Sequence, residues 1–421
     1  MTSTIRVTSP QDLLALIPVL AGYRPERSLV CLVFREDRVV GVLRYDLPRC
    51  AADREPLVNA AVGVLCRIPD ADGLVLASFS AARFRSRAGG GERALLRLLM
   101  RRARDAGFAI RDVLRVAADG WGSMLDAGTP ADGHDLELVR GAGVTSHPAI
   151  AAQVPGDLHA CATVPDVTDG ELERVRLALR VLDAEFGAGA DADDDRRAAS
   201  GHGGHAPAPG LAPADPVDLV ELLLARPPDA EPTNDDVARI AWLARLAAVP
   251  VARDAMMLQI AFGAVAGRAA LAEFGDGDGD GDGDGDERTD HDGRTPQGGP
   301  FRAGDLHVPL GRLLLGETST RPDVRRIEDG TAVILRAAAS ARSRERAGLC
   351  CMAAWLMWGL GRGSAAARLL ETSLEAEPGH RMASLLARYF ATGALPDWVF
   401  RRTDAERSAT QVQCPTSGAM S

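Results

Sequence analysis

The chain has 421 residues, of which 46% are hydrophobic but only 4% aromatic. This length leaves room for two domains, and the composition supports a core built mainly from Ala, Leu and Val. The formal net charge of −10 argues against a general nucleic-acid-binding protein, which needs a basic surface to neutralise phosphates.

The apolar runs are all much shorter than the ~18 residues that a membrane span requires, and the first residues contain no apolar signal-peptide core. The seven cysteines form no CxxC pair, and Cys31 falls within a predicted buried strand. Unpatterned cysteines in odd number are typical of a reduced protein rather than of a disulfide framework. We therefore expect a cytoplasmic protein without membrane contact.

The first predicted elements are a short helix and two strands. Ser9 and Pro10 form a typical helix start, because serine caps free backbone N–H groups and proline has no N–H to leave unsatisfied. Pro18 should end or kink this helix after about two turns. The apolar run 28–35 then predicts a buried strand, followed after a tight turn by a second strand over 38–47.

The second of these strands carries a candidate site. Strand alternation places Arg44 and Asp46 side by side at the polar end of a face that begins with valines. Two interpretations remain open: an ion pair on a strand that emerges into solvent, and the polar wall of a pocket at the sheet edge. In the second interpretation Ser28, Arg44 and Asp46 are the ligand-binding residues.

Helices and strands alternate up to residue 186. The predicted helices cover 51–67, 92–106 and 170–186, and the predicted strands cover 73–79, 110–117 and 121–125. This alternation indicates a mixed, partly parallel sheet with flanking helices. We assign residues 1–186 to this α/β domain.

The second half of the chain is predicted to be all-α. Residues 187–216 are rich in Gly, Ala, Pro and Asp and predict a disordered linker, as do the Gly-Asp pairs of an insert at 275–300. We assign residues 217–400 to a helical domain and 401–421 to a disordered tail. The predicted helices cover 216–225, 234–248, 251–274, 327–344, 348–360, 364–376 and 381–391.

Residues 355–378 resemble a single tetratricopeptide helical hairpin. Gly361 precedes Ala366, Leu370 and Pro378 at the spacings of the turn and helix contacts in that repeat. One repeat cannot form the concave groove that three or more provide, so a packed helix pair is favoured. The helical half is also our candidate surface for a protein partner.

Residues near both ends resemble the actinobacterial family called domain of unknown function 4192. They are Ser9, Pro10, Leu13, Leu14, Pro18, Leu20, Gly22, Tyr23, Pro25, Ser28, Leu29, Val30 and Arg44 to Pro48, and later Ala354, Trp355, Gly361, Gly363, Ala366, Leu374, Pro378, Leu385 and Leu386. The resemblance spans roughly residues 5–400. It implies a bacterial protein of unassigned activity and supplies no catalytic residues.

Two further patterns favour ordinary structure over a ligand site. Asp276, Asp278, Asp280 and Glu287 match a calcium-loop template, but a Gly-Asp repeat satisfies most of that template by itself, so a solvated acidic loop is favoured. The triple glycine 89–91 opens a helix after a strand, as a phosphate cradle does. It lacks a following Lys-Ser/Thr pair and the spacing of a dinucleotide fingerprint, so we favour a simple connection.

The histidines suggest no metal site. His134, His147 and His159 lie in one irregular region with several aspartates, but their spacing fits no metal-binding pattern. No metal or other cofactor is predicted.

Two functions from different classes remain. The leading hypothesis is a non-catalytic protein that binds a ligand or a partner and acts in regulation. The alternative is a small-molecule hydrolase or transferase with its site where Arg44, Asp46, Asp119 and His134 meet at the strand ends, although no known catalytic motif is present. Nucleic-acid binding through the arginine-rich helix 92–104 is disfavoured, because no aromatic residues are interleaved for base stacking.

Overall fold

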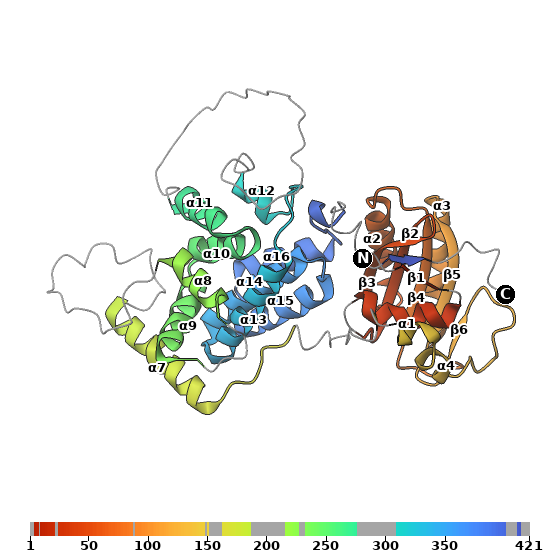
Figure 1. Cartoon of the computed structure of the whole chain (residues 1–421), viewed down its shortest axis with the longest axis horizontal. Coiled ribbons are helices and arrows are strands. Elements are labelled where there is room, and N and C mark those ends of the chain that lie inside the picture. Colours follow the sequence, from red (N-terminus) through yellow and green to blue (C-terminus); the bar gives the residue numbers. More distant parts are fainter. Residues whose placement is uncertain are drawn as a thin grey trace, which may run out of the picture. The chain divides into compact units, whose positions relative to one another are not determined.

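The computed structural model describes residues 4–7, 9–21, 24–86, 89–147, 150, 162–186, 215–226, 232–275, 309–400 and 411–413. The chain divides into two compact units (Figure 1). The α/β unit comprises Met1–Cys161, Thr392–Ala394 and Phe400–Ser421, and the helical unit comprises Ala162–Ala391 and Leu395–Val399.

The α/β unit is built on a seven-stranded sheet with the order β1-β7-β3-β2-β4-β5-β6 (Figure 1). The strands are β1 (Thr4–Arg6), β2 (Ser28–Arg35), β3 (Arg38–Asp46), β4 (Gly73–Phe79), β5 (Ala109–Val116), β6 (Trp121–Ser123) and β7 (Gln411–Gln413). The pairs β4–β5 and β1–β7 are parallel, and the other described pairs are antiparallel. The predicted mixed, partly parallel sheet is thus confirmed.

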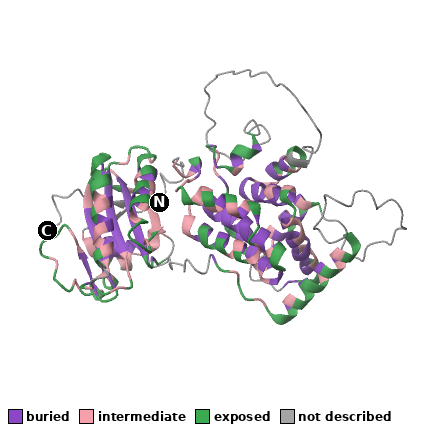
Figure 2. Ribbon diagram, turned by 180° about the vertical axis from the view of Figure 1, so that it is seen from behind, coloured by how far each residue is buried: buried purple, intermediate pink, exposed green. Residues whose placement is uncertain are grey.

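Helices cover both faces of this sheet. α1 (Pro10–Ala21) packs on one face, where Val30 and Leu32 of β2 are buried. α2 (Arg54–Cys66) and α3 (Gly89–Asp105) pack on the other face, over Leu29 and Cys31. β2 is therefore buried on both sides, as its continuous apolar run predicts, and Figure 2 shows the buried strands between the helices.

α1 begins as predicted but continues past its proline. The Ser9 hydroxyl accepts a hydrogen bond from the Asp12 backbone N–H at 3.3 Å, so the predicted cap forms. Pro18 lies inside the helix, which ends at Ala21. Burial of Leu13 and Ile17 against the sheet offsets the backbone hydrogen bond that the proline cannot donate.

A strand occurs within the predicted disordered tail. β7 pairs in parallel with β1 and also meets Arg38 of β3. A strand of three residues gains its hydrogen bonds only from distant neighbours, so the local sequence gives little signal for it. The other residues of the predicted tail, residues 187–214 of the linker and residues 276–300 of the Gly-Asp insert lie outside the described part.

The helical unit confirms the prediction of an all-α second half. Its helices are α7 (Asp169–Phe186), α8 (Pro216–Leu224), α9 (Asn234–Ala247), α10 (Pro250–Phe262), α11 (Ala264–Gly275), α12 (Leu310–Leu314), α13 (Val324–Ser340), α14 (Ser343–Gly359), α15 (Gly363–Ala376) and α16 (Arg381–Ala391). α14 and α15 form the expected hairpin, with Gly361 between them at φ +74°. None of the described helices combines the length and apolarity required to cross a bilayer.

α7 belongs to the helical unit, although the sequence interpretation placed it in the first half. It packs against α9 and α13. Arg336 of α13 also binds both carboxylate oxygens of Glu171 in α7, at 2.9 and 3.0 Å. The two units therefore divide between Cys161 and Ala162 rather than after Phe186.

Candidate functional site

Ser28, Arg44 and Asp46 form one hydrogen-bonded group at the end of β2 and β3. Ser28 pairs with Asp46 and Val30 pairs with Arg44, so their side chains share the α1 face of the sheet. Arg44 donates from Nε to Ser28 Oγ at 2.8 Å and contacts Asp46 Oδ1 through Nη2 at 2.6 Å. Ser28 in turn donates to the Glu26 carbonyl oxygen at 2.6 Å.

This group has the geometry of a strand-end ion pair. The Arg44 side chain is 8% exposed and the Asp46 side chain 71% exposed, so the pair extends from a buried guanidinium to solvent. Arg44 Nη1 is buried without a hydrogen-bond partner among the described residues. None of these three residues lines the open cavity at the same end of the sheet.

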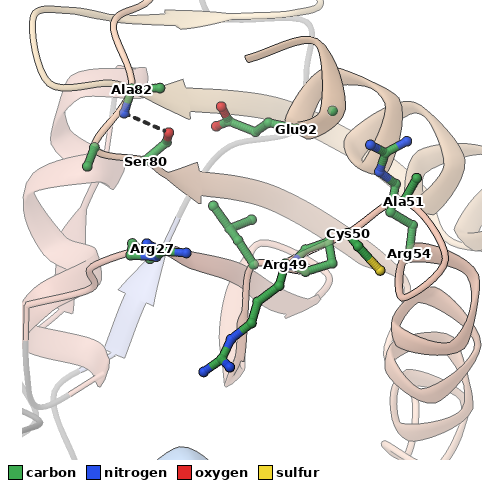
Figure 3. A pocket seen from close by; sticks show the side chains of 12 residues that line it. Arg27, Arg49, Cys50, Ala51, Arg54, Ser80, Ala82 and Glu92 are labelled. Carbon is green, nitrogen blue, oxygen red and sulfur yellow. Dashed lines mark hydrogen bonds between the residues drawn. The ribbon is translucent and has the colours of Figure 1, made fainter. Parts of the chain in front are cut away.

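An open cavity of about 530 Å³ lies at the same end of the sheet on the opposite face, beside α2 and α3 (Figure 3). Its polar lining residues are Arg27, Arg49, Cys50, Arg54, Ser80 and Glu92. They come from the residue before β2, the β3–α2 connection, the first residue of α2, the connection after β4 and the first turn of α3. The volume is typical of small-molecule sites, and the carboxyl end of a strand beside helix N-termini is where α/β proteins usually bind ligands.

Three arginines of this cavity have no counter-ion among the described residues. The guanidinium groups of Arg27, Arg49 and Arg54 make no hydrogen bond or ion pair with any residue that the structure describes. In the same unit Arg44 and Arg111 are both paired with aspartates. Unpaired guanidinium groups around one cavity are well suited to bind phosphate or carboxylate.

Arg54, the first residue of α2, lies against the first turn of α3. A Cβ atom at Gly91 would come within 2.9 Å of Arg54 Nη2, so a glycine permits this close approach. The N-terminus of α3 carries a partial positive charge and unpaired backbone N–H groups. The Arg54 guanidinium therefore adds positive charge beside this helix end, and such a helix end readily binds anions.

The backbone of Arg27 adopts the left-handed conformation, with φ +44°. This conformation costs about 1–2 kcal/mol for a residue with a side chain. The Arg27 carbonyl oxygen accepts a hydrogen bond from the Leu47 N–H at 2.8 Å, which ties two walls of the cavity together. Backbone strain of this kind is concentrated at functional sites.

Glu92 is the acidic residue of the cavity wall, and the protein already binds its carboxylate. It accepts hydrogen bonds from the Ser78 hydroxyl and, at 3.3 Å, from Arg115 Nη2. The Glu92 and Arg115 side chains are only 6% and 3% exposed, and Arg115 also lies over the Phe84 ring at 4.7 Å. This buried pair fixes one carboxylate in the wall of an otherwise cationic cavity.

Two nucleophile-bearing side chains also line the cavity. Ser80 Oγ accepts a hydrogen bond from the Ala82 N–H at 3.1 Å (Figure 3). The exposed Cys50 thiol donates to Asp53 Oδ2 at 3.1 Å. By contrast, burial raises the pKa of Cys31 to about 12, so that thiol remains protonated and unreactive.

Asp119 and His134 do not meet Arg44. β2 and β4 separate β3 from β5, so at ~4.8 Å per strand the backbones of β3 and β5 lie about 14 Å apart. Asp119 accepts a hydrogen bond from the Phe84 N–H at 2.7 Å, and the His134 ring packs against Trp121 with centroids 4.9 Å apart. Asp119 thus fixes the connection after β4, and His134 packs on β6.

The structure gives no support to a metal site in the part of the chain that it describes. No group of three His, Cys, Asp or Glu side chains there is arranged to hold a metal ion. His159 and the acidic residues of the calcium-loop template lie outside that part.

The sequence interpretation missed the residues of the cavity. Arg27 and Arg49 lie between predicted elements and Arg54 lies within the predicted helix 51–67, and nothing local distinguishes them from the other arginines. The triple glycine 89–91 gave the one usable signal, since it opens a helix after a strand, and Gly91 does line the cavity. Glu92, in the first turn of the same helix, carries no motif of its own.

The chain matches the family model described as Domain of unknown function (DUF4192) over residues 10–273 and 324–397. It belongs to the DUF4192 family. The match includes segments of both units, in agreement with the resemblance noted near both ends of the sequence. No curated protein and no solved structure matches this DUF4192 protein.

Proposed function

We propose that this DUF4192 protein binds a small molecule with phosphate or carboxylate groups in the cavity of its α/β unit, and that it is a non-catalytic binding or regulatory protein. The observation that carries the proposal is Arg54, whose unpaired guanidinium lies against the positive end of α3. Arg27 and Arg49 add two more unpaired charges. An anion in the cavity would compensate all of these groups at once.

A thermal-shift and calorimetry panel of phosphate, pyrophosphate, sugar phosphates, nucleotides and dicarboxylates tests this proposal. A ligand at about a hundred times its Kd stabilises the native state by ~2.7 kcal/mol, which raises the melting temperature measurably. We expect Arg54→Ala to weaken the binding of the best ligand by about tenfold or more, because hydrogen bonds to charged groups contribute ~1.5–3 kcal/mol.

Arg101→Ala is the matched control. Arg101 lies on the exposed side of α3 and does not line the cavity, so its loss removes the same charge from the same helix. We expect the affinity to change by less than about twofold, as for a screened surface charge. A panel without any hit, or a hit that Arg27→Ala and Arg54→Ala both leave unchanged, contradicts the proposal.

Cys50 supports a second function, a small-molecule hydrolase or transferase. Its thiol lies at the cavity beside the Asp53 carboxylate, where it could attack a bound ligand as a nucleophile. Mass spectrometry of the panel ligand after incubation would detect turnover. On this alternative Cys50→Ser abolishes turnover but leaves the calorimetric affinity within about twofold, whereas an unchanged ligand in the wild type argues against an enzyme.

The proposal also includes a cytoplasmic location and a protein partner for the helical unit. The described cysteines are Cys31, Cys50, Cys66, Cys350 and Cys351, and all are free, which supports a reducing compartment. Leu385 of α16 is 55% exposed, which makes it accessible to a cross-linking reagent. Cross-linking from position 385 in cells tests for such a partner.

A further inference from the structure

The charged side chains of the cavity reach it from different sides. Figure 3 shows Arg27 and Arg54 on opposite sides of the cavity, and the Glu92 carboxylate points in from a third side, beside Ser80. Arg27 precedes β2, Arg54 begins α2, and Glu92 comes from the first turn of α3. No described residue of the lining is aromatic, so the cavity offers no stacking surface for a base.

The number of unpaired charges indicates more than one anionic group in the ligand. Glu92 is already paired with Arg115, so it does not neutralise Arg27, Arg49 or Arg54. The cavity of about 530 Å³ is large enough for a whole metabolite. A ligand with two separated anionic groups can therefore contact guanidinium groups on both sides of it.

Glu92 determines what fits between those anionic groups. A continuous polyphosphate offers only acceptor oxygens, which cannot form hydrogen bonds with the Glu92 carboxylate. A hydroxyl group would instead donate a hydrogen bond to it. The structure gives each Glu92 oxygen one protein donor, Ser78 or Arg115, so each keeps further acceptor capacity. The Ser80 hydroxyl accepts from Ala82 N–H and can still donate its own proton.

The geometry points to a polyol bisphosphate as the ligand class: a hydroxylated carbon chain or sugar with a phosphate group at each end. The phosphates pair with the arginines on the two sides, and the hydroxyl groups contact Glu92 and Ser80 in between. This inference rests on the proposed function, since it names the kind of anion that the cavity takes.

Calorimetry with three probes tests the inference on the full-length protein. The probes are fructose 1,6-bisphosphate, fructose 6-phosphate and inorganic tripolyphosphate. We expect the bisphosphate to bind at least about tenfold more tightly than either of the others, which corresponds to ~1.4 kcal/mol. Tripolyphosphate carries the highest charge density, so simple electrostatic attraction would favour it instead.

Glu92→Gln should change the affinities for the bisphosphate and for tripolyphosphate in opposite directions. Glutamine keeps the shape and one acceptor oxygen, but it removes the negative charge. We expect severalfold weaker binding of the bisphosphate and severalfold tighter binding of tripolyphosphate. If the melting temperature shows that this variant does not fold, Ser80→Ala replaces it. Ser80→Ala should weaken the binding of the bisphosphate and leave the binding of tripolyphosphate unchanged.

The outcomes separate this inference from the proposed function. One outcome is that tripolyphosphate binds the wild type more tightly than the bisphosphate and that Arg54→Ala weakens the binding of both probes. The polyol inference is then overturned, and the anion-binding function stands. If no probe and no other anion binds, both fail. A bisphosphate preference that reverses in Glu92→Gln supports both.

Discussion

Arginine is the only strongly basic residue of this protein, because the sequence contains no lysine. Its guanidinium groups therefore serve both structure and ligand binding. Arg44 and Arg115 are buried, and each is bound to a carboxylate within its own unit. Arg27 and Arg54 line a cavity without such a partner among the described residues. The difference between the two groups lies in their surroundings and not in the residue type.

Strand alternation predicted one polar group correctly but could not predict the cavity. Arg44 and Asp46 are two residues apart on one strand, so their contact follows from local geometry, and the structure confirms it. Arg27, Arg54 and Glu92 come from three segments that meet only when α2 and α3 pack on the sheet. Their proximity depends on tertiary contacts that no local pattern contains.

Asp112 of β5 provides a stability prediction. It is 8% exposed, and burial raises its pKa, although hydrogen bonds from Ser123 Oγ and Val113 N–H favour the charged form. Because the pKa of Asp112 is higher in the folded protein, its protonated carboxyl group contributes to the free energy of unfolding below the unfolded pKa of ~3.9. This contribution is lost as the pH rises through the folded-state pKa. The ionised carboxylate thus destabilises the unit at neutral pH.

Asp112→Asn should therefore stabilise the α/β unit at pH 7. The asparagine oxygen can accept the same two hydrogen bonds without a buried charge. Urea unfolding over pH 4–7 should show a stability gain that grows with pH, and each kcal/mol corresponds to roughly 2–4 °C in melting temperature for a unit of this size. Asp105→Asn, which removes an exposed charge at the end of α3, is the control. A gain that is the same at every pH would contradict this account.

At the scale of elements, helix positions were predicted better than helix ends. The sequence indicates one helix over 251–274, whereas the structure has α10 and α11, separated at Gly263. Gly263 has φ +95°, a conformation that terminates a helix. The apolar pattern continues on both sides of it, so periodicity alone could not reveal the break. By contrast, α9 begins at the predicted residue, Asn234, with Thr233 as its cap.

The break at Gly263 can be tested with a matched pair of variants. A Cβ atom at Gly263 or at Gly170 of α7 would meet nothing within 4 Å, but only Gly263 has a positive φ. We expect Gly263→Ala to destabilise the helical unit by about 1–2 kcal/mol and Gly170→Ala to stabilise it by up to about 1 kcal/mol. Chemical denaturation followed by circular dichroism measures both. Equal effects of the two variants would show that backbone conformation is not the cause.

At the scale of the whole molecule, the fold class of each half was predictable, but the assignment of segments to units was not. α7 has an amphipathic pattern that would suit either unit, and only its contacts with α9 and α13 decide between them. β7 is separated from β6 by the entire helical unit, so its place in the sheet requires a long-range pairing that composition cannot indicate.

The position of β7 also bears on how the chain is made. β7 lies between β1 and β3 in the sheet but leaves the ribosome after all residues of the helical unit. The nascent α/β unit therefore has an open strand edge at β3 while the helical unit is translated, and open edges favour pairing with neighbouring chains. The pairing that covers the Arg38 end of this edge thus depends on a segment that is synthesised after the helical unit.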